Sequence, residues 1–222
     1  MKKPSSSPAQ RGRSAIADAV RKRGQSPYNL WIIRPPLDGE DIVVNSDPKM
    51  ELVYLLEGDP QLDEIDYGPL RQAPVGDTKG PRRRPPAGPE HFANVVRAGV
   101  PGRVLWGGTR PPQTALLAPA DLYLTFVDLD GQVMRIDNWR RIAAAIRRVR
   151  AFPTTALERQ VMASLGQRAA MSVADVLEAA AAQPPAMVLG VIGLLLRRRL
   201  ADSDADRRPW SMHTRIWARR PS

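Results

Sequence analysis

The sequence predicts a protein of mixed α/β class, in which a larger domain of short strands and helices precedes a smaller, mainly helical domain. Three observations predict this class. Short β-branched and aromatic runs, separated by turns containing Pro and Gly, fill much of the first two thirds of the chain. An amphipathic helical pattern closes that region. From Pro153 onward the chain changes to short helical segments with capping signals and ends in a strand-like alternation.

Composition limits the kinds of site that the chain can hold. With 222 residues and 43% hydrophobic content, the chain can form one large domain or two small ones. It has no cysteine, which excludes a disulfide framework and a thiolate zinc site. Two histidines, His91 and His213, are too few for a histidine-rich metal site. A reducing, cytoplasmic location is expected.

No segment has the pattern of a targeting signal or a membrane span. The N-terminus, MKKPSSSPAQRGRS, is basic and lacks the apolar core of a signal peptide. The longest apolar run, Ala186 to Leu196, is about half of the ~20 residues that a spanning helix needs. We therefore expect no membrane partner.

The charge of the chain predicts an anionic partner. The net charge is +10 and the isoelectric point about 10.7, and nucleic acid is the commonest partner of such a chain. Residues 1–25 contain almost no large apolar residue and are expected to form a flexible basic arm. The Pro- and Gly-rich loop 72–90 is long for a compact domain and is expected to be disordered or to lie against a phosphate backbone. Its candidate DNA contacts are Arg82, Arg83 and Arg84.

The first domain is predicted over residues 26–152. Two short strands, LWII and IVV, flank a Pro-Pro-Leu-Asp-Gly turn. A helix then starts with Ser46 or Asp47 as N-cap and Pro48 in its first turn. Further strands are expected in EIDYGPL, in HFANVVRAGVPGRVLW around a Gly-Val-Pro-Gly turn, and in a hairpin turning at Asp130-Gly131. The helix NWRRIAAAIRRVRAF follows, with Trp139, Ile142, Ile146 and Val149 on one face and arginines on the other.

The second domain is predicted over residues 153–222. Thr155-x-x-Glu158 and Ser172-x-x-Asp175 read as capping boxes of two helices, and Pro184-Pro185 starts a third, strongly apolar helix. A polar hairpin tip and an alternating strand over Trp210, Met212, Thr214 and Ile216 come last. Three helices followed by a hairpin is the order of a winged helix.

In a winged helix the third helix or the wing usually meets the duplex. The middle of the third helix lacks an exposed polar face, which favours backbone contacts over base readout. The alternative is a domain that binds only protein, with its arginines as a solvated rim. The candidate phosphate contacts are Arg197, Arg198, Arg199, Arg207, Arg208 and Arg215.

The order of these segments, from about Ser26 to Ala218, resembles the TnsA-like family of transposon-end endonucleases. The resemblance rests on NSDPKMELVYLLEGDPQLDEIDYGPL, on HFANVVRAGVPGRVLW and on the C-terminal winged-helix pattern. It implies a restriction-endonuclease-like domain of mixed sheet, followed by a small winged-helix domain. It also implies a metal site built from a helix glutamate, an aspartate on a central strand and a Gln/Glu-x-Lys on the next strand. Glu51 matches the helix glutamate, although an acid in a first helical turn is also favoured by the helix dipole.

The remaining site positions depart from the family pattern. Asn94 stands where the strand aspartate is expected, and an amide is a weaker ligand for a hard cation. Gly107 and Gly108 occupy the region of the acid and lysine, and Arg110 is the only cation nearby. Two-metal cleavage needs clustered carboxylates, and an arginine remains protonated and cannot help to activate water. We therefore expect no cofactor, with Mg²⁺ or Mn²⁺ bound at Glu51 only if a site survives.

Three functions remain open from the sequence. The first is a catalytically degenerate, double-stranded-DNA-binding scaffold in transposition or recombination, acting with a transposase or recombinase and an AAA+ ATPase. The second is an active endonuclease that uses Glu51 and a relocated acid, for which the acids crowded in EGDPQLDEID and around the last predicted hairpin are candidates. The third is a winged-helix transcriptional regulator or adaptor.

Overall fold

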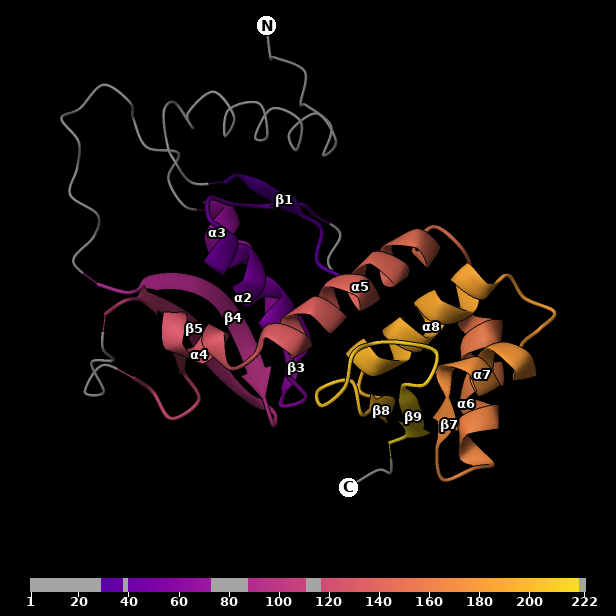
Figure 1. The fold of residues 1–222 in the computed structure, drawn as a ribbon. Helices are drawn as coiled ribbons and strands as arrows, with labels where there is room; N and C mark the ends of the chain where they lie inside the picture. The colour runs from indigo at the N-terminus through magenta and orange to yellow at the C-terminus, as the bar shows by residue number, and fades with distance from the viewer. Residues whose placement is uncertain (1–28, 38–39, 73–87, 111–116, 220–222) are drawn as a thin grey trace, which may run out of the picture. The chain divides into compact units, whose positions relative to one another are not determined.

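The computed structural model describes residues 29–37, 40–72, 88–110 and 117–219. The predicted basic arm, most of the 72–90 loop and the arginines at 82–84 lie outside these ranges. The described residues form seven helices and nine strands in three sheets, one of them a four-stranded mixed sheet (Figure 1). The predicted mixed α/β class is confirmed.

The chain divides into two compact units. Unit 1 comprises Met1–Glu51 and Glu64–Val127, and unit 2 comprises Leu52–Asp63 and Asp128–Ser222. The chain passes from one unit to the other inside helix α2 (Asp47–Glu57), strand β3 (Leu62–Asp66) and helix α4 (Phe126–Asp130). This division differs from the sequence-predicted boundary between residues 152 and 153.

Unit 1 contains two sheets that follow local sequence signals. Strands β1 (Trp31–Ile33) and β2 (Ile42–Val44) pair antiparallel, as predicted, and an Arg34–Asp41 ion pair of 2.7 Å lies beside the connection. The larger sheet has the order β3-β4-β5-β6. Its strands β4 (Glu90–Arg97) and β5 (Val100–Gly108) are antiparallel, and β6 (Leu122–Thr125) runs parallel to β5. Helix α3 (Gly68–Gln72) follows β3.

Three predicted details of unit 1 are wrong. The β4–β5 turn is formed by Ala98 and Gly99, both with positive φ, so it shares only Gly99 with the predicted Gly-Val-Pro-Gly turn, and Val100 to Gly102 belong to β5. In EIDYGPL the strand ends at Asp66, whose side chain accepts a hydrogen bond from the Gly68 amide and turns the chain into α3. The hairpin at Asp130-Gly131 does not form, because β6 has β5 as its partner and the chain continues into helices α4 and α5.

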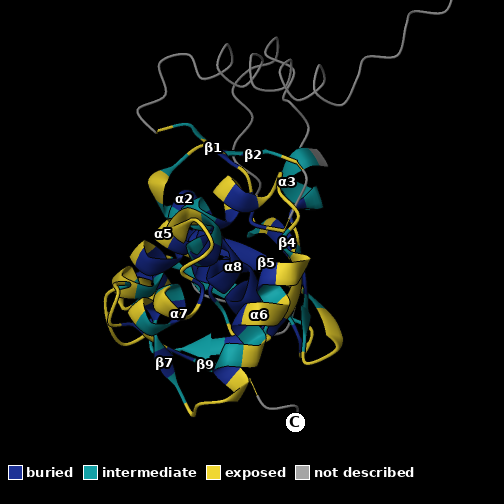
Figure 2. Cartoon of the chain, turned by 90° about the vertical axis from the view of Figure 1, so that its right-hand side faces the viewer, coloured by how far each residue is buried: buried dark blue, intermediate teal, exposed yellow. Residues whose placement is uncertain are grey.

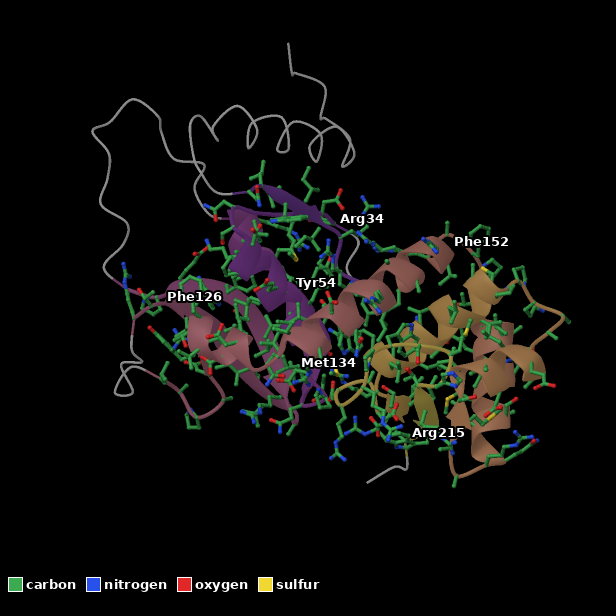
Figure 3. The ribbon with its side chains drawn as sticks, viewed as in Figure 1. Arg34, Tyr54, Phe126, Met134, Phe152 and Arg215 are labelled. Carbon is green, nitrogen blue, oxygen red and sulfur yellow. The ribbon has the colours of Figure 1, made fainter. Side chains whose placement is uncertain are left out.

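Unit 2 is organised around two packed helices, α5 (Val133–Val149) and α8 (Pro185–Arg197), which lie side by side in Figure 1. The predicted apolar face of α5 is buried, and α8 is buried along most of its length (Figure 2). Gly190 and Gly193 let the two helices approach closely: a Cβ built on Gly190 would lie 2.4 Å from Val149 Cγ1. The labelled side chains of Met134 and Phe152 in Figure 3 lie near the two ends of α5.

The other elements of unit 2 pack beside this helix pair. A three-stranded sheet has the order β7-β9-β8. The predicted capping box at Ser172 and Asp175 is present. The elements are α6 (Thr155–Gly166), β7 (Met171–Ser172), α7 (Val173–Ala179), β8 (Ala201–Ser203) and β9 (Arg215–Ala218).

Two predictions in unit 2 are wrong. Helix α6 has Thr154 as its N-cap, and the Thr154 hydroxyl donates to the Glu158 side chain instead of capping an amide. The predicted strand over 210–216 begins only at Arg215. The preceding residues form a turn, in which the Ser211 amide donates to the Thr214 hydroxyl. Across the described ranges, no helix has the length and apolar character to cross a membrane.

Candidate functional site

Glu51 lies on α2, and the start of this helix is held by polar contacts. The carboxylate of Asp47 accepts hydrogen bonds from the side chains of Asn29 and Trp31. These bonds, the Asn29 bond first, lower the pKa of Asp47. Lys49 forms a 2.6 Å ion pair with Glu90 of β4. The structure therefore places Glu51 one turn after a fixed helix start, in a half-buried position.

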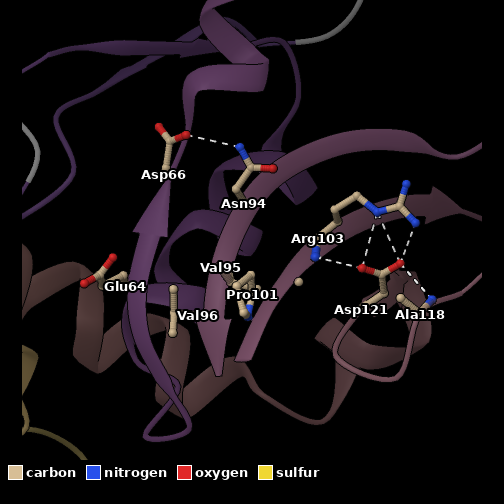
Figure 4. A pocket seen from close by; sticks show the side chains of 10 residues that line it. Glu64, Asp66, Asn94, Val95, Val96, Pro101, Arg103, Ala118 and Asp121 are labelled. Atoms are coloured by element: carbon tan, nitrogen blue, oxygen red, sulfur yellow. Dashed lines mark hydrogen bonds and ion pairs between the residues drawn. The ribbon is translucent and has the colours of Figure 1, made fainter. Parts of the chain in front are cut away.

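Asn94 lies on β4, and both the nitrogen and the oxygen of its side-chain amide are hydrogen-bonded. Its Nδ2 donates to Asp66 Oδ2 at 3.2 Å, and its Oδ1 accepts from His91 Nε2 at 2.9 Å. Asp66 lies on the neighbouring strand, as Figure 4 shows. The position at which the resemblance implies an aspartate thus belongs to a hydrogen-bonded group of one acid, one amide and one imidazole. The imidazole is that of His91.

The resemblance implies an acid near Gly107 on β5, and the space beside Gly107 is occupied by Tyr123 of β6. A Cβ on Gly107 would lie 2.2 Å from the hydroxyl oxygen of Tyr123, so no side chain fits there unless Tyr123 moves. That hydroxyl donates to the Arg110 carbonyl at 3.1 Å. The Arg110 guanidinium donates to the Gly88 carbonyl at 2.6 Å.

These contacts do not fit the metal-binding set that the resemblance implies. An amide and a glycine replace two expected carboxylates, and the tyrosine occupies the space of one of them. In the part of the chain that the structure describes, no group of three or more His, Asp or Glu side chains is arranged to hold a metal ion.

A pocket of about 530 Å³ opens beside Asn94 in unit 1 (Figure 4). Its charged lining residues are Glu64, Asp66, Asp121 and Arg103. Asp121 is buried and receives bonds from the Arg103 guanidinium, at 2.6 Å, and from the Ala118 amide, at 3.0 Å. The guanidinium is the main reason that the pKa of Asp121 is lowered to about 2. With three acids and one paired arginine, this pocket is unsuited to a phosphodiester.

Two of the predicted DNA contacts lie inside unit 2. Arg197 is buried, with a side chain 3% exposed, and pairs with the buried carboxylate of Glu57 in α2. Arg199 donates to the carbonyls of Asp59 and Leu62. Burial, followed by repulsion from Arg197, lowers the pKa of Arg199 to about 10. Both arginines hold residues 52–63 against the end of α8, so neither is placed for the predicted phosphate contact.

The other predicted contacts of this unit are at its surface. Arg198 forms a 2.8 Å ion pair with Glu158, and Arg208 lies 3.9 Å from Asp204. Arg207 is exposed, as is Arg215 on β9 (Figure 3). The loop that carries Arg207 and Arg208 is fixed by buried Asn138 of α5. The side chain of Asn138 donates to the Arg208 carbonyl and accepts from the Trp210 amide, both at 2.7 Å.

The exposed face of α5 carries four further arginines that were not among the predicted contacts. The helical period predicts arginines on this face, but the predicted DNA contacts followed the winged-helix pattern to other positions. We call this set the α5 basic face: Arg140, Arg141, Arg147 and Arg148, all exposed.

Comparisons of this chain with family models, with curated proteins and with solved structures found no match.

Proposed function

We propose that this chain is a DNA-binding protein with a TnsA-like architecture, whose nuclease domain has lost its metal site and serves as a scaffold in transposition or recombination. Two observations together support the proposal. Unit 2 carries exposed arginines, and in unit 1 Tyr123 occupies the space beside Gly107, near which the resemblance implies an acid.

The order of elements supports the nuclease-like part. Helix α2 with Glu51 precedes three consecutive strands of one sheet, β3, β4 and β5, and the fourth strand, β6, is parallel to β5. Asn94 lies on the second of these strands and Gly107 on the third, in the order that the resemblance gives for the strand aspartate and the acid-x-lysine. The order α6, β7, α7, α8, β8, β9, with all three strands in one sheet, supports the winged-helix part.

The loss of catalysis is proposed from the side chains around Gly107. Cleavage by two metal ions requires several carboxylates close together, because the ions and the developing charge must be balanced. Tyr123 occupies the space next to Gly107, and the amide of Asn94 is already hydrogen-bonded to Asp66 and His91.

A plasmid-nicking assay with Mg²⁺ or Mn²⁺ tests this loss. We expect no metal-dependent nicking by the wild-type protein, at the level of a Glu51→Ala control. Nicking that requires metal and disappears in Glu51→Ala would refute the loss of activity.

The proposed DNA binding predicts that the affinity for duplex DNA depends on salt concentration. Each arginine that contacts a phosphate releases counterions, so the logarithm of the association constant falls linearly with the logarithm of salt concentration. Fluorescence anisotropy with a labelled duplex measures the slope. Binding that barely changes between low and moderate salt would contradict a phosphate-backbone mode.

One contact favours the active endonuclease as a second candidate. The Asp66 carboxylate lies 3.2 Å from the Asn94 amide, beside the position where the resemblance implies the strand aspartate, so Asp66 is our candidate for the relocated ligand. If nicking is found, an Asp66→Asn variant should abolish it together with Glu51→Ala. A transposase and an AAA+ ATPase are the proposed protein partners, and co-purification with proteins of these two classes in the presence of transposon-end DNA tests them.

A further inference from the structure

The α5 basic face consists of two arginine pairs on one side of a helix. Arg140 and Arg147 are seven residues apart, as are Arg141 and Arg148, so the pairs lie two turns, or about 10.5 Å, apart. Ala144, between them, is small. The opposite side of the helix carries Ile142 and Ile146, both almost fully buried.

The charge of this face is largely uncompensated. The side chains of Arg140, Arg147 and Arg148 have no hydrogen bond or ion pair to another described residue. Arg141 lies 3.6 Å from Asp137, but both side chains are 57% exposed, and such a surface pair is weak. Two other exposed arginines have closer acidic partners: Arg198 lies 2.8 Å from Glu158, and Arg103 lies 2.6 Å from Asp121. A helix face that is merely solvated usually alternates bases with acids four residues apart; here Asp137–Arg141 is such a pair, and Arg140, Arg147 and Arg148 have no acid four residues before or after them in α5.

The helix that carries these arginines is closely packed and hydrogen-bonded within unit 2. The backbone of α5 is held against α8 by the close approach at Gly190 and Gly193. Asn138, one turn before Arg141, ties the 205–210 loop to α5 through three hydrogen bonds. Because the Arg208 carbonyl is bonded to Asn138, the exposed side chains of Arg207 and Arg208 start beside the N-terminal half of α5. They are a second set of exposed arginines in unit 2, anchored to the same helix through the loop backbone.

The chemistry of this surface favours phosphate groups. All cationic side chains in unit 2 are arginines, since lysine occurs only at positions 2, 3, 22, 49 and 79. The planar guanidinium binds phosphate through two parallel hydrogen bonds and is less strongly hydrated than an ammonium group. The C-terminal half of the α5 face has no Asn, Gln, Glu or Asp side chain to read base edges. Backbone contact to a duplex, with its regular rows of phosphates, is the mode that this composition fits.

We infer that the α5 basic face, together with Arg207 and Arg208, is the main surface on which unit 2 binds the phosphate backbone of double-stranded DNA. This inference rests on the proposed DNA-binding function and moves its principal contact from the end of α8 to α5.

A matched pair of double variants of the full chain tests the assignment. Arg147→Gln with Arg148→Gln removes two charges from the α5 basic face. Arg159→Gln with Arg168→Gln removes two charges from exposed positions on and just after α6. Both variants have the same net charge, and glutamine preserves helix propensity. Thermal unfolding followed by circular dichroism checks that both are folded.

The measured quantities are the affinity for a labelled duplex of random sequence and its salt slope. The α5 variant should bind roughly tenfold or more weakly at moderate salt, and its slope should fall by about 2, or about 1 for each phosphate that is no longer bound. The α6 variant should keep the wild-type slope. Lysine at both α5 positions should restore most of the slope, because slope depends on charge, but not all of the affinity, because the fork geometry is absent.

The outcomes separate this inference from the proposed function. If the wild-type protein does not bind the duplex, or binds anionic phospholipid vesicles more tightly than DNA in the same salt, the proposed function fails and the inference with it. If the wild type binds DNA and the α5 and α6 variants are weakened equally, net charge alone explains binding and only the inference fails. If the α5 variant binds DNA as tightly as the wild type, the inference also fails while the proposed function stands.

Discussion

The guanidinium of Arg197, at the end of α8, forms a buried ion pair with the carboxylate of Glu57, at the end of α2, across 140 positions of the chain. Both side chains are almost fully inaccessible to solvent. A buried pair of this kind is costly to disrupt on one side, because the remaining charge has no compensating partner. It ties residues 52–63 into the core of unit 2.

Replacing Arg197 with alanine should therefore destabilise the protein by about 3–5 kcal/mol. Chemical denaturation followed by circular dichroism measures the change. Replacing both partners with apolar residues of similar size, Glu57→Leu with Arg197→Met, should recover most of the stability, since no buried charge then remains. An Arg197→Ala variant as stable as wild type would show that the pair is hydrated.

Gly190 sets the distance between α5 and α8. An alanine Cβ there would lie 2.4 Å from Val149 Cγ1 and 2.9 Å from the backbone oxygen of Ala145. Gly190→Ala should lower stability by about 1–3 kcal/mol through overpacking, despite the higher helix propensity of alanine. Gly166→Ala, the same change at the open end of α6, is the matched control. No atom lies within 4 Å of its added Cβ, so stability should stay equal or rise by up to about 1 kcal/mol.

The Arg103–Asp121 ion pair predicts an acid-sensitive part of the stability. The guanidinium lowers the pKa of Asp121 to about 2 from its ordinary value of 3.8. A carboxyl group with a depressed folded-state pKa stabilises the fold above its unfolded pKa, and this contribution disappears as pH falls from about 4 to about 2. Since Arg103 is half exposed, the contribution should be about 1–2 kcal/mol.

An Asp121→Asn variant measures this contribution. Its deficit relative to wild type should be present at pH 6 and should shrink toward pH 2 in denaturation experiments. A deficit that stays constant over this range would assign the effect to the missing hydrogen bonds at Ala118 and Arg103 and not to the charge.

Local patterns predicted the elements whose partners lie nearby in sequence. Strands β1 and β2, the β4–β5 pair, the Ser172 capping box and the buried face of α5 all have signals within a few residues. Strand β6 was assigned to a hairpin because its partner, β5, lies across a long connection and runs parallel to it. Alternation in sequence does not show which strand is the partner.

The site residues illustrate the same limit. The run of three arginines at 197–199 has the local appearance of a surface patch, yet Arg197 is paired with Glu57. Of the two glutamates in α2, the structure buries Glu57 and leaves Glu51 half-buried. Only the long-range fold brings these charges together. The α5 basic face was visible in the helical period, but its importance depends on which arginines have acidic partners, and that information is three-dimensional.

Gly107 and Tyr123 give a test of why the expected acid position carries no side chain. A Cβ at residue 107 would lie 2.2 Å from the Tyr123 hydroxyl and 2.5 Å from its ring carbon Cζ, so Gly107→Ala should cost about 1–3 kcal/mol. Tyr123→Ala should also be destabilising, because it removes a side chain packed on β5 and a hydrogen bond to the Arg110 carbonyl.

The double variant distinguishes a steric conflict from two independent effects. If Tyr123 is the obstacle, Gly107→Ala should cost nothing further, or even stabilise, once residue 123 is alanine, giving a coupling of about 1–3 kcal/mol in a double-mutant cycle. Costs that simply add would mean that the cost of Gly107→Ala does not come from the contact with Tyr123. In that case the position of Tyr123 would no longer account for the absence of the expected carboxylate.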